Sequence, residues 1–380
     1  MIQDKIIVEH IELHFGKMED PRNSSLCRHK LIDILGIAIL AVICGANEWT
    51  EIEEYGNSKI EFLEKYFELP NGIPSHDTFG RFFRLLNPKE FEKYFAEWVK
   101  SMCEILEGDI INLDGKQLRG SYDTLGEKSA IYMVSAWSNA NNLVLGQVKV
   151  AEKSNEITAI PKLLDLVEIA GSVVTIDAMG TQKKVAKKIR SKEADYVLAL
   201  KGNQSNLHKE VQEAFKQKGG EKKAAINEEL EADHGRIEQR KCYVLPASEW
   251  IGSTELTKWK DLATIIKIES NVFYKNGKKE GKTSFEERYY ISSLAPDAAR
   301  LNQTVRKHWG IETKVHWILD VAFSEDKSRV RTGHGDENFS ILRKIALNKL
   351  KNESSVKRGI KTKRKKAGWN DDFLLEIFLT

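Results

Sequence analysis

The middle of the chain alternates short apolar runs with stretches of helical periodicity, and this alternation constrains the fold more than any other feature of the sequence. Residues 109–115 form a short alternating apolar run that ends in Asp-Gly. Two further runs, at 130–138 and 143–150, are rich in Val, Tyr, Trp and Leu, and the turn-forming segment 139–142 separates them. Apolar runs joined by tight turns predict three consecutive strands.

Helix and strand patterns then alternate up to residue 200. We expect a helix at 156–170, a strand at 172–177, a helix at 182–192 and a strand at 196–200. The order βββαβαβ predicts a mixed sheet flanked by helices. Because this is the order of the RNase H-like fold, we expect the fold class to be α/β with an RNase H-like core.

The chain before this core has a helical texture. Apolar residues recur at helical spacing in 31–46 and in 79–86. Ser75 is a candidate N-cap for the second of these helices, and Asn87-Pro88 has the cap and the N1 proline that open a further helix. We therefore predict an all-helical N-terminal domain over residues 1–107.

After residue 200 an inserted segment separates the predicted core strands from the last predicted core helix. Strand-like runs between about 203 and 294 predict a β-rich insertion. A long helix is expected at 297–322, followed by a shorter one that ends near 350, so the core domain with its insertion spans 108–350. Residues 351–380 are expected to form a basic tail.

The composition sets broad limits on function. The net charge of +3 permits a polyanionic partner without requiring one, and an ordinary soluble enzyme accounts for it equally well. None of the 4 cysteines stands in a Cys-x-x-Cys pair, which is typical of reduced thiols in a cytosolic protein. The apolar run 31–46 is shorter than the roughly 20 residues of a membrane span, so we expect no membrane partner and a cytoplasmic location.

Two acidic residues end predicted strands. Asp114 ends the first strand and Asp177 ends the fourth. Functional groups gather at strand ends near a topological switch point, so these carboxylates lie side by side if their strands are neighbours. Two such carboxylates repel each other unless a cation lies between them, and ligand sets made only of oxygen favour Mg²⁺ or Mn²⁺.

A third acid lies on the long predicted helix. Helical spacing puts Glu312 on one face with apolar and aromatic residues and a histidine, namely Val305, Trp309, His316 and Leu319. A carboxylate on such a face is costly unless it is paired or binds metal, although a place at the edge of a solvated face is the alternative. Two metal ions about 4 Å apart are suited to in-line phosphoryl displacement. We therefore predict that Asp114, Asp177 and Glu312 are catalytic and bind two Mg²⁺ or Mn²⁺ ions.

Motifs along nearly the whole chain resemble those of insertion-sequence DDE transposases, and most closely the H-repeat-associated group. They are Asp20-Pro21-Arg22, Cys44-Gly45-Ala46, the segment 72–79, Leu113-Asp114-Gly115-Lys116, Thr175-Ile176-Asp177-Ala178, the segments 200–204 and 234–238, His308-Trp309-Gly310-Ile311-Glu312, and the segment 316–321. Each motif is weak alone, but together and in this order they are specific.

The resemblance implies an RNase H-like core with a β insertion before the helix that carries Glu312. It implies hydrolysis at element ends and attack of the freed 3′-hydroxyl on target DNA, so the expected partners are the double-stranded element ends and target. A homodimer in the DNA complex is a further expectation, as is a bacterial location on the nucleoid when DNA is bound. Relatives in the wider group carry Tyr, Arg and Lys where Val305, His308 and Leu319 stand here.

The DNA contacts that those residues would make must therefore come from elsewhere. Residues 1–107 are interpreted as DNA-binding, with a helix-turn-helix as one way to read the terminal repeats. Candidate DNA-contacting side chains are Lys116, Arg119, Lys201, His234, Arg236, Arg306 and Lys314. His308 and His316, which flank Glu312, are expected to support the acids rather than bind the ions.

Three rival functions use the same observations. One is an RNase H-like nuclease without strand transfer, and another is an inactive or domesticated copy that only binds DNA. A glycoside hydrolase with two carboxylates is the third, but it needs no third acid.

Overall fold

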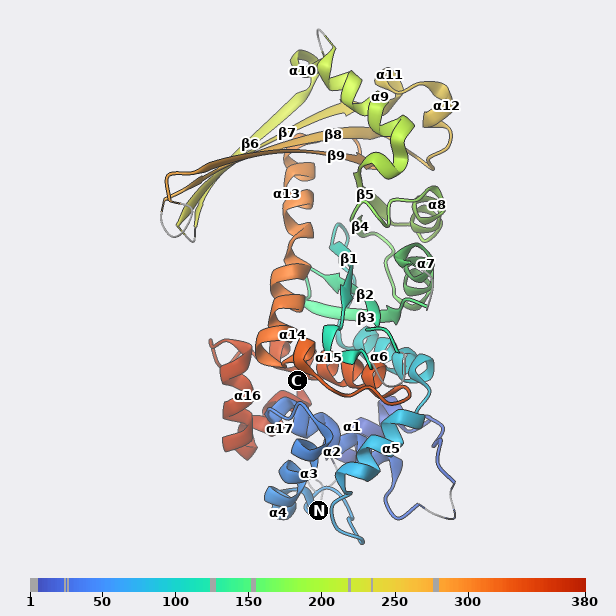
Figure 1. The fold of residues 1–380 in the computed structure, drawn as a ribbon, viewed down its shortest axis with the longest axis vertical. Helices are drawn as coiled ribbons and strands as arrows, with labels where there is room; N and C mark the ends of the chain where they lie inside the picture. Colours follow the sequence, from blue (N-terminus) through green and yellow to red (C-terminus); the bar gives the residue numbers. More distant parts are fainter. Residues whose placement is uncertain are drawn as a thin grey trace.

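A computed structural model describes residues 6–380, except for 24, 26, 124–127, 152–154, 218–219, 234 and 276–279. The predicted residue His234 thus lies outside the described residues. Helices fill the lower half of the molecule in Figure 1, and a long sheet runs through the middle to the top.

The core sheet follows the predicted order of elements. Its strands are β1 (Ile110–Gln117), β2 (Tyr132–Ser138), β3 (Leu143–Lys149), β4 (Val173–Ile176) and β5 (Asp195–Leu200). They lie in the order β3-β2-β1-β4-β5, in which β1 is antiparallel to β2 and parallel to β4. Helices α7 (Glu156–Leu166) and α8 (Lys183–Ser191) pack on one side of it. The prediction of an RNase H-like α/β core is confirmed.

The insertion extends this sheet. Its strands are β6 (Ala225–Asp233), β7 (Arg236–Pro246), β8 (Thr264–Tyr274) and β9 (Thr283–Ser292). Because β9 pairs antiparallel with β5, the two sets form one nine-stranded sheet. The short helices η3 (Gly202–Gln204), α9 (Ser205–Lys216), α10 (Gly220–Lys223), α11 (Ala247–Trp250) and α12 (Ser253–Leu256) accompany it. The β-rich content was expected, whereas the continuity with the core sheet was not.

The helix predicted at 297–322 is present and contains a π-helical segment. It consists of α13 (Ala298–His308), the π-helical segment η5 (Glu312–His316) and α14 (Trp317–Ala322). The predicted long helix is thus present, and the π-helical segment within it was not predicted; such segments take up an extra residue and are often found at functional sites. The short helix η6 (Glu325–Lys327) follows.

The N-terminal residues are helical as predicted. They form α1 (Ile6–Phe15), α2 (Leu31–Cys44), α3 (Trp49–Ser58), α4 (Ile60–Leu63), α5 (His76–Leu85) and α6 (Pro88–Met102). The Ser75 hydroxyl accepts a hydrogen bond from the backbone of Thr78 at 3.3 Å, and the Asn87 side chain accepts one from Lys89 at 3.0 Å, so both predicted caps are confirmed. In the described residues no single helix is long and apolar enough to cross a membrane; α2 and α3 pass that test only as a pair bent by 93°.

The C-terminal residues are folded rather than forming a tail. Helix α15 (Gly335–Asn352) is largely buried, and α16 (Ile360–Trp369) and α17 (Asp371–Leu379) pack against α2. The guanidinium of Arg364 is buried and donates to the carbonyl oxygens of Val42 at 2.8 Å and Ala46 at 3.1 Å. The expectation of a basic tail over 351–380 was therefore wrong, because the charge at Arg364 serves to satisfy the C-terminal carbonyls of α2.

Candidate active site

The strand register brings the two predicted aspartates to the same edge of the sheet. Leu113 of β1 is paired with Ile176 of β4 in a parallel ladder. Asp114 directly follows Leu113 and Asp177 directly follows Ile176, so the two aspartates follow paired positions of neighbouring strands. The Asp177 carboxylate also accepts a hydrogen bond from the backbone of Gly180 at 3.1 Å.

The helix acid lies beside the first aspartate. Asp114, Glu312 and His316 each offer one possible ligand atom, and these atoms all lie within 4.8 Å of one another. His316 Nδ1 is 3.4 Å from Asp114 Oδ2 and 3.7 Å from Glu312 Oε2. Since Glu312 and His316 begin and end the π-helical segment, this local distortion determines how both side chains face the strand.

The charges in this group are poorly balanced. Burial raises the pKa of Asp114 to about 7 against the effect of His316, and the charges of Glu312 and Asp177 raise it further. The hydrogen bond from His316 lowers the pKa of Glu312. His316 itself is buried, and its Nε2 has no hydrogen-bond partner among the described residues. Carboxylates gathered in this way, with one of them more strongly affected by burial than by His316, are suited to a divalent cation.

A fourth acid, which the sequence did not indicate, lies near the aspartates. Burial raises the pKa of Glu156 on α7, against a hydrogen bond with Tyr132, and the charge of Asp177 raises it further. Gly115 permits this approach, because a Cβ there would lie 2.5 Å from Glu156 Oε1. Asp114 was predicted to end the first strand, but β1 continues to Gln117, and Gly115 within it makes room for a neighbouring carboxylate.

Buried polar residues of the strands fix the end of α13. Asn112 of β1 donates a hydrogen bond to the carbonyl oxygen of Lys307 at 2.7 Å. The Thr175 hydroxyl of β4 is 2.9 Å from His308 Nδ1. Burial lowers the pKa of His308 to about 4, so its imidazole is neutral at pH 7. Asn112 and Thr175 were not predicted; their signal is a polar residue inside an otherwise apolar strand.

Lys116 is engaged in a buried ion-pair network. Its ammonium pairs with Asp320 of α14 and lies 3.0 Å from Glu325 Oε2. Although burial opposes ionisation, Lys116, Lys344 and Arg343 lower the pKa of Glu325 to about 2. Lys116 therefore connects β1 to α14, and its ammonium is engaged by these carboxylates, which argues against the prediction that it contacts DNA.

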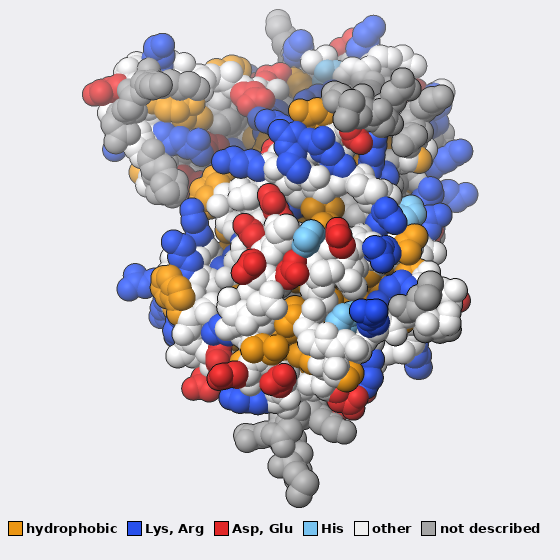
Figure 2. Space-filling view, turned by 60° about the horizontal axis from the view of Figure 1, so that its bottom comes forward, with side chains coloured by type: hydrophobic (Ala, Val, Ile, Leu, Met, Phe, Trp, Pro, Cys, Tyr) orange, Lys and Arg blue, Asp and Glu red, His pale blue; other side chains and the backbone are white. Residues whose placement is uncertain are grey.

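The other predicted DNA contacts are dispersed. Arg119 in η2 (Arg119–Ser121) is exposed and lies 3.6 Å from Asp326, and Lys201 is exposed after β5. Lys314 donates to Asn142 at 3.3 Å, while Arg236 and Arg306 pair with Glu238 at 3.9 Å and Glu231 at 2.7 Å. Figure 2 shows a face on which Lys and Arg side chains form several clusters around a smaller group of Asp and Glu side chains and a His. Positive charge is thus local on a chain whose net charge is only +3.

The sheet order and the carboxylates at its edge define an RNase H-like protein with an acidic site. Comparisons with known proteins agree. A family model described as "Transposase DDE domain" matches residues 106–349, and one described as "DDE_Tnp_1-associated" matches residues 13–99.

Curated relatives match over almost their whole length. "Putative transposase YncI" of Escherichia coli O157:H7 is 43% identical over 365 residues, which cover 96% of this chain and 93% of the relative. "H repeat-associated putative transposase YhhI" and "Putative protein YbfL", both of Escherichia coli strain K12, are each 38% identical and cover 98% of this chain and 97% of their own. The chain belongs to the insertion-sequence DDE transposases, in the H-repeat-associated group.

Proposed function

We propose that this protein is a DNA transposase that hydrolyses phosphodiester bonds at the ends of its element and joins the freed 3′-hydroxyls to target DNA. The observation that carries the proposal is the approach of Glu312 to Asp114, whose ligand atoms lie within 4.8 Å of each other although they are far apart in sequence. Asp177, at the end of the adjoining strand, is the third proposed catalytic residue.

We assign Asp114, Asp177 and Glu312 as ligands of two Mg²⁺ or Mn²⁺ ions. Their donor atoms are all carboxylate oxygens, which these hard cations prefer. The raised pKa of Asp114 supports the assignment, because this buried carboxyl lacks enough positive charge from the protein alone. Ions held there supply Lewis-acid activation of the attacking oxygen and stabilisation of the leaving oxygen.

The surrounding residues position the carboxylates. His316 contacts both Asp114 and Glu312, and thereby orients the strand acid and the helix acid relative to each other. Asn112 fixes the end of α13 on β1, and Lys116 fixes α14 on the same strand. All three act through the acids rather than on the DNA.

The proposed partners are the two element ends and the target, all double-stranded DNA. We assign residues 1–107 to DNA binding and 108–350 to catalysis, and we propose that two copies act together because two ends are processed. The names of the relatives support a role in transposition. The proposed location is the bacterial cytoplasm, on the nucleoid when DNA is bound.

The test uses the full chain and DNA that carries the inverted repeats bordering its coding region. With Mg²⁺ present, the protein should cut at the repeat ends and join them to a supercoiled plasmid. Asp114→Asn should abolish both steps and leave DNA binding intact, whereas Asp165→Asn, at a largely exposed carboxylate, should leave both unchanged.

Each departure from that result has a clear meaning. Cleavage without joining would assign an RNase H-like nuclease instead. DNA binding without cleavage in the unsubstituted protein would assign an inactive, DNA-binding relative. Cleavage that survives Asp114→Asn would contradict the carboxylate mechanism.

A further inference from the structure

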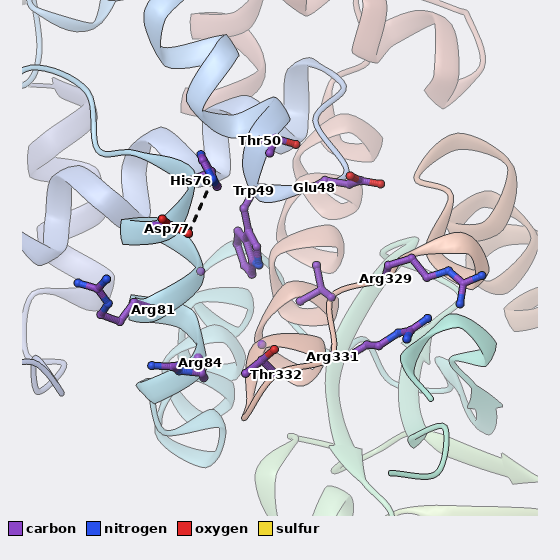
Figure 3. A pocket seen from close by; sticks show the side chains of 13 residues that line it. Glu48, Trp49, Thr50, His76, Asp77, Arg81, Arg84, Arg329, Arg331 and Thr332 are labelled. Carbon is purple, nitrogen blue, oxygen red and sulfur yellow. Dashed lines mark ion pairs between the residues drawn. The ribbon is translucent and has the colours of Figure 1, made fainter. Parts of the chain in front are cut away.

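A cavity lined by four arginines lies apart from the carboxylates, between α5, the start of α3 and the segment 329–335. Its volume is about 440 Å³. We call it the arginine groove and define it by Arg81 and Arg84 of α5, Arg329 and Arg331, with Trp49 between the two pairs (Figure 3). None of the four was a candidate in the sequence, because the two pairs are far apart along the chain.

The four guanidinium groups are not neutralised by the protein. Within the part of the chain that the structure describes, none of them forms an ion pair with a carboxylate. Glu48 and Asp77 also line the groove, but Asp77 is directed to His76, at 3.7 Å. Elsewhere most arginines near the sheet are paired, as Arg306 is with Glu231 at 2.7 Å. Unpaired cations gathered on one surface favour an anionic partner.

Contacts with the loop after β1 hold one arginine pair in place. Arg331 Nε donates to the carbonyl oxygen of Gly120 at 3.3 Å, and Arg329 Nη1 donates to the Tyr122 hydroxyl at 3.4 Å. Both guanidinium groups lie over the Tyr122 ring, at 5.6 Å for Arg329 and 5.0 Å for Arg331. The Arg331 carbonyl oxygen accepts from Lys128 Nζ at 2.6 Å. The hydrogen bond from Arg329 also lowers the pKa of Tyr122, as expected beside concentrated positive charge.

A glycine brings this segment against the other pair. Gly333 has a φ of +56°, and a Cβ there would lie 2.4 Å from Cγ of Arg84. The backbone of His334 donates to the carbonyl oxygen of Arg84 at 3.2 Å. The two arginine pairs are therefore fixed relative to each other by backbone contacts and not by a flexible linker.

The directions of the side chains indicate the shape of the ligand. In Figure 3 Arg81 and Arg84 point to one side, and Arg329 and Arg331 point to the other, with Trp49 and Thr332 between them. Four cations that diverge cannot all contact one small anion. They suit a polyanion that runs across the surface, whose phosphates meet forked guanidinium groups in turn.

We infer that the arginine groove binds the sugar–phosphate backbone of double-stranded DNA. The inference rests on the proposed function for the identity of the polyanion. The groove is connected to the site through the chain itself, because β1 carries Asp114 and leads through η2 to Tyr122, on which Arg329 and Arg331 lie. These contacts position DNA and carry no sequence preference.

The test measures binding of a fluorescein-labelled 30-base-pair duplex to the full chain at several salt concentrations. Each lost phosphate contact should reduce the slope of log K against log salt by about one unit. Arg329→Gln with Arg331→Gln should therefore reduce the slope by about two units and weaken binding more than tenfold at moderate salt. Arg81→Gln with Arg84→Gln should do the same, and this pair makes no side-chain hydrogen bond in the described residues whose loss would disturb folding.

The matched control is Arg300→Gln with Arg358→Gln, which removes the same charge from exposed positions outside the groove. This control should keep the original slope. If both double variants of the groove bind DNA with the same affinity and the same salt dependence as the control, the inference is wrong. It is also wrong if inorganic phosphate binds in a titration calorimeter, Arg329→Gln with Arg331→Gln removes that binding, and DNA binding is unaffected.

These outcomes are separate from those of the proposed function. Loss of DNA binding in the groove variants supports the inference that the arginine groove binds DNA, even if the unsubstituted protein fails to cut DNA. Conversely, normal binding by the groove variants overturns only the groove if Asp114-dependent cleavage is observed.

Discussion

His316 Nδ1 lies 3.4 Å from Asp114 Oδ2, and this contact joins the π-helical segment to the central strand of the core sheet. The imidazole of His316 is buried, so water does not readily replace it as the neighbour of Asp114. The relative position of Asp114 and Glu312 therefore depends on a residue one helical turn away from Glu312.

Replacing His316 should loosen the carboxylates without removing any of them. We expect His316→Ala to raise the Mg²⁺ concentration for half-maximal cleavage by about 10- to 100-fold, with partial recovery at high Mg²⁺. His316→Asn should recover part of the loss, because its amide can still donate to Asp114. His334→Ala, at a half-exposed histidine, is the control. An unchanged Mg²⁺ dependence in His316→Ala would exclude a positioning role.

Glu325 should make the fold sensitive to acid. Its pKa in the folded protein, about 2, lies below the ordinary glutamate value of 4.5, so the stabilisation is present above pH 4.5 and is lost as the pH falls toward 2. The pKa difference corresponds to about 3 kcal/mol. Urea denaturation between pH 7 and pH 3 should show about two thirds of this loss, because protonation of the folded state is complete only below pH 2. In Glu325→Gln the free energy of unfolding at pH 7 should fall by about 3 to 5 kcal/mol, because Lys116 and Lys344 lose a buried partner. Glu97→Gln, at an exposed pair, should change it by less than about 1 kcal/mol.

Lys349 is a buried cation whose charge should destabilise the fold at neutral pH, in contrast to the stabilising charge of Glu325. Burial lowers its pKa to about 8 from 10.5, and its ammonium lies near the rings of Trp98 and Phe378. The unfolded chain therefore binds more protons between about pH 8 and pH 10.5, and this group makes stability rise with pH in that window. Lys349→Met should stabilise the protein at pH 7 by about 1 to 3 kcal/mol in urea denaturation and flatten the curve between pH 8 and 10. A destabilised Lys349→Met would show that the ammonium is held by favourable ring contacts instead.

Arg364 should be essential to the helical half of the molecule. Its guanidinium donates to Val42 and Ala46 and lies 4.0 Å from the centre of the Phe323 ring. Arg364→Ala removes the side-chain donor to the carbonyl oxygens of Val42 and Ala46 and the packing on Phe323, so we expect a loss of about 3 kcal/mol or more. Lys365→Ala, at the neighbouring exposed position, should be nearly neutral. Equal stabilities of the two variants, measured by thermal and urea unfolding, would contradict this role.

The sequence predicted those parts of the fold that depend on local patterns. Strand and helix periodicity over 109–200 determined the core order, and the caps at Ser75 and Asn87 needed only neighbouring residues. The adjacency of Asp114 and Asp177 followed from fold topology, since parallel neighbours bring their ends together. Their role in catalysis stays a prediction.

The features that were missed depend on long-range packing. The extra residue in the π-helical segment leaves the apolar spacing almost unchanged, so a regular helix was the natural interpretation. The buried position of Arg364 depends on carbonyl groups far away in sequence, and a cluster of Lys and Arg alone indicated a solvated tail. Glu156 and the arginine groove likewise require the tertiary structure, because their members come from separate elements.

The pairing of β9 with β5 has a mechanical consequence. Backbone pairing continues from strand to strand between β6 and β3, so the insertion and the core are coupled through one sheet. The strands β6 and β7 therefore belong to the same sheet as β1, which contains Asp114, and β4, which leads to Asp177. A displacement at the projecting end of β6 and β7 would therefore reach β1 and β4 through the backbone hydrogen bonds of the strands between them.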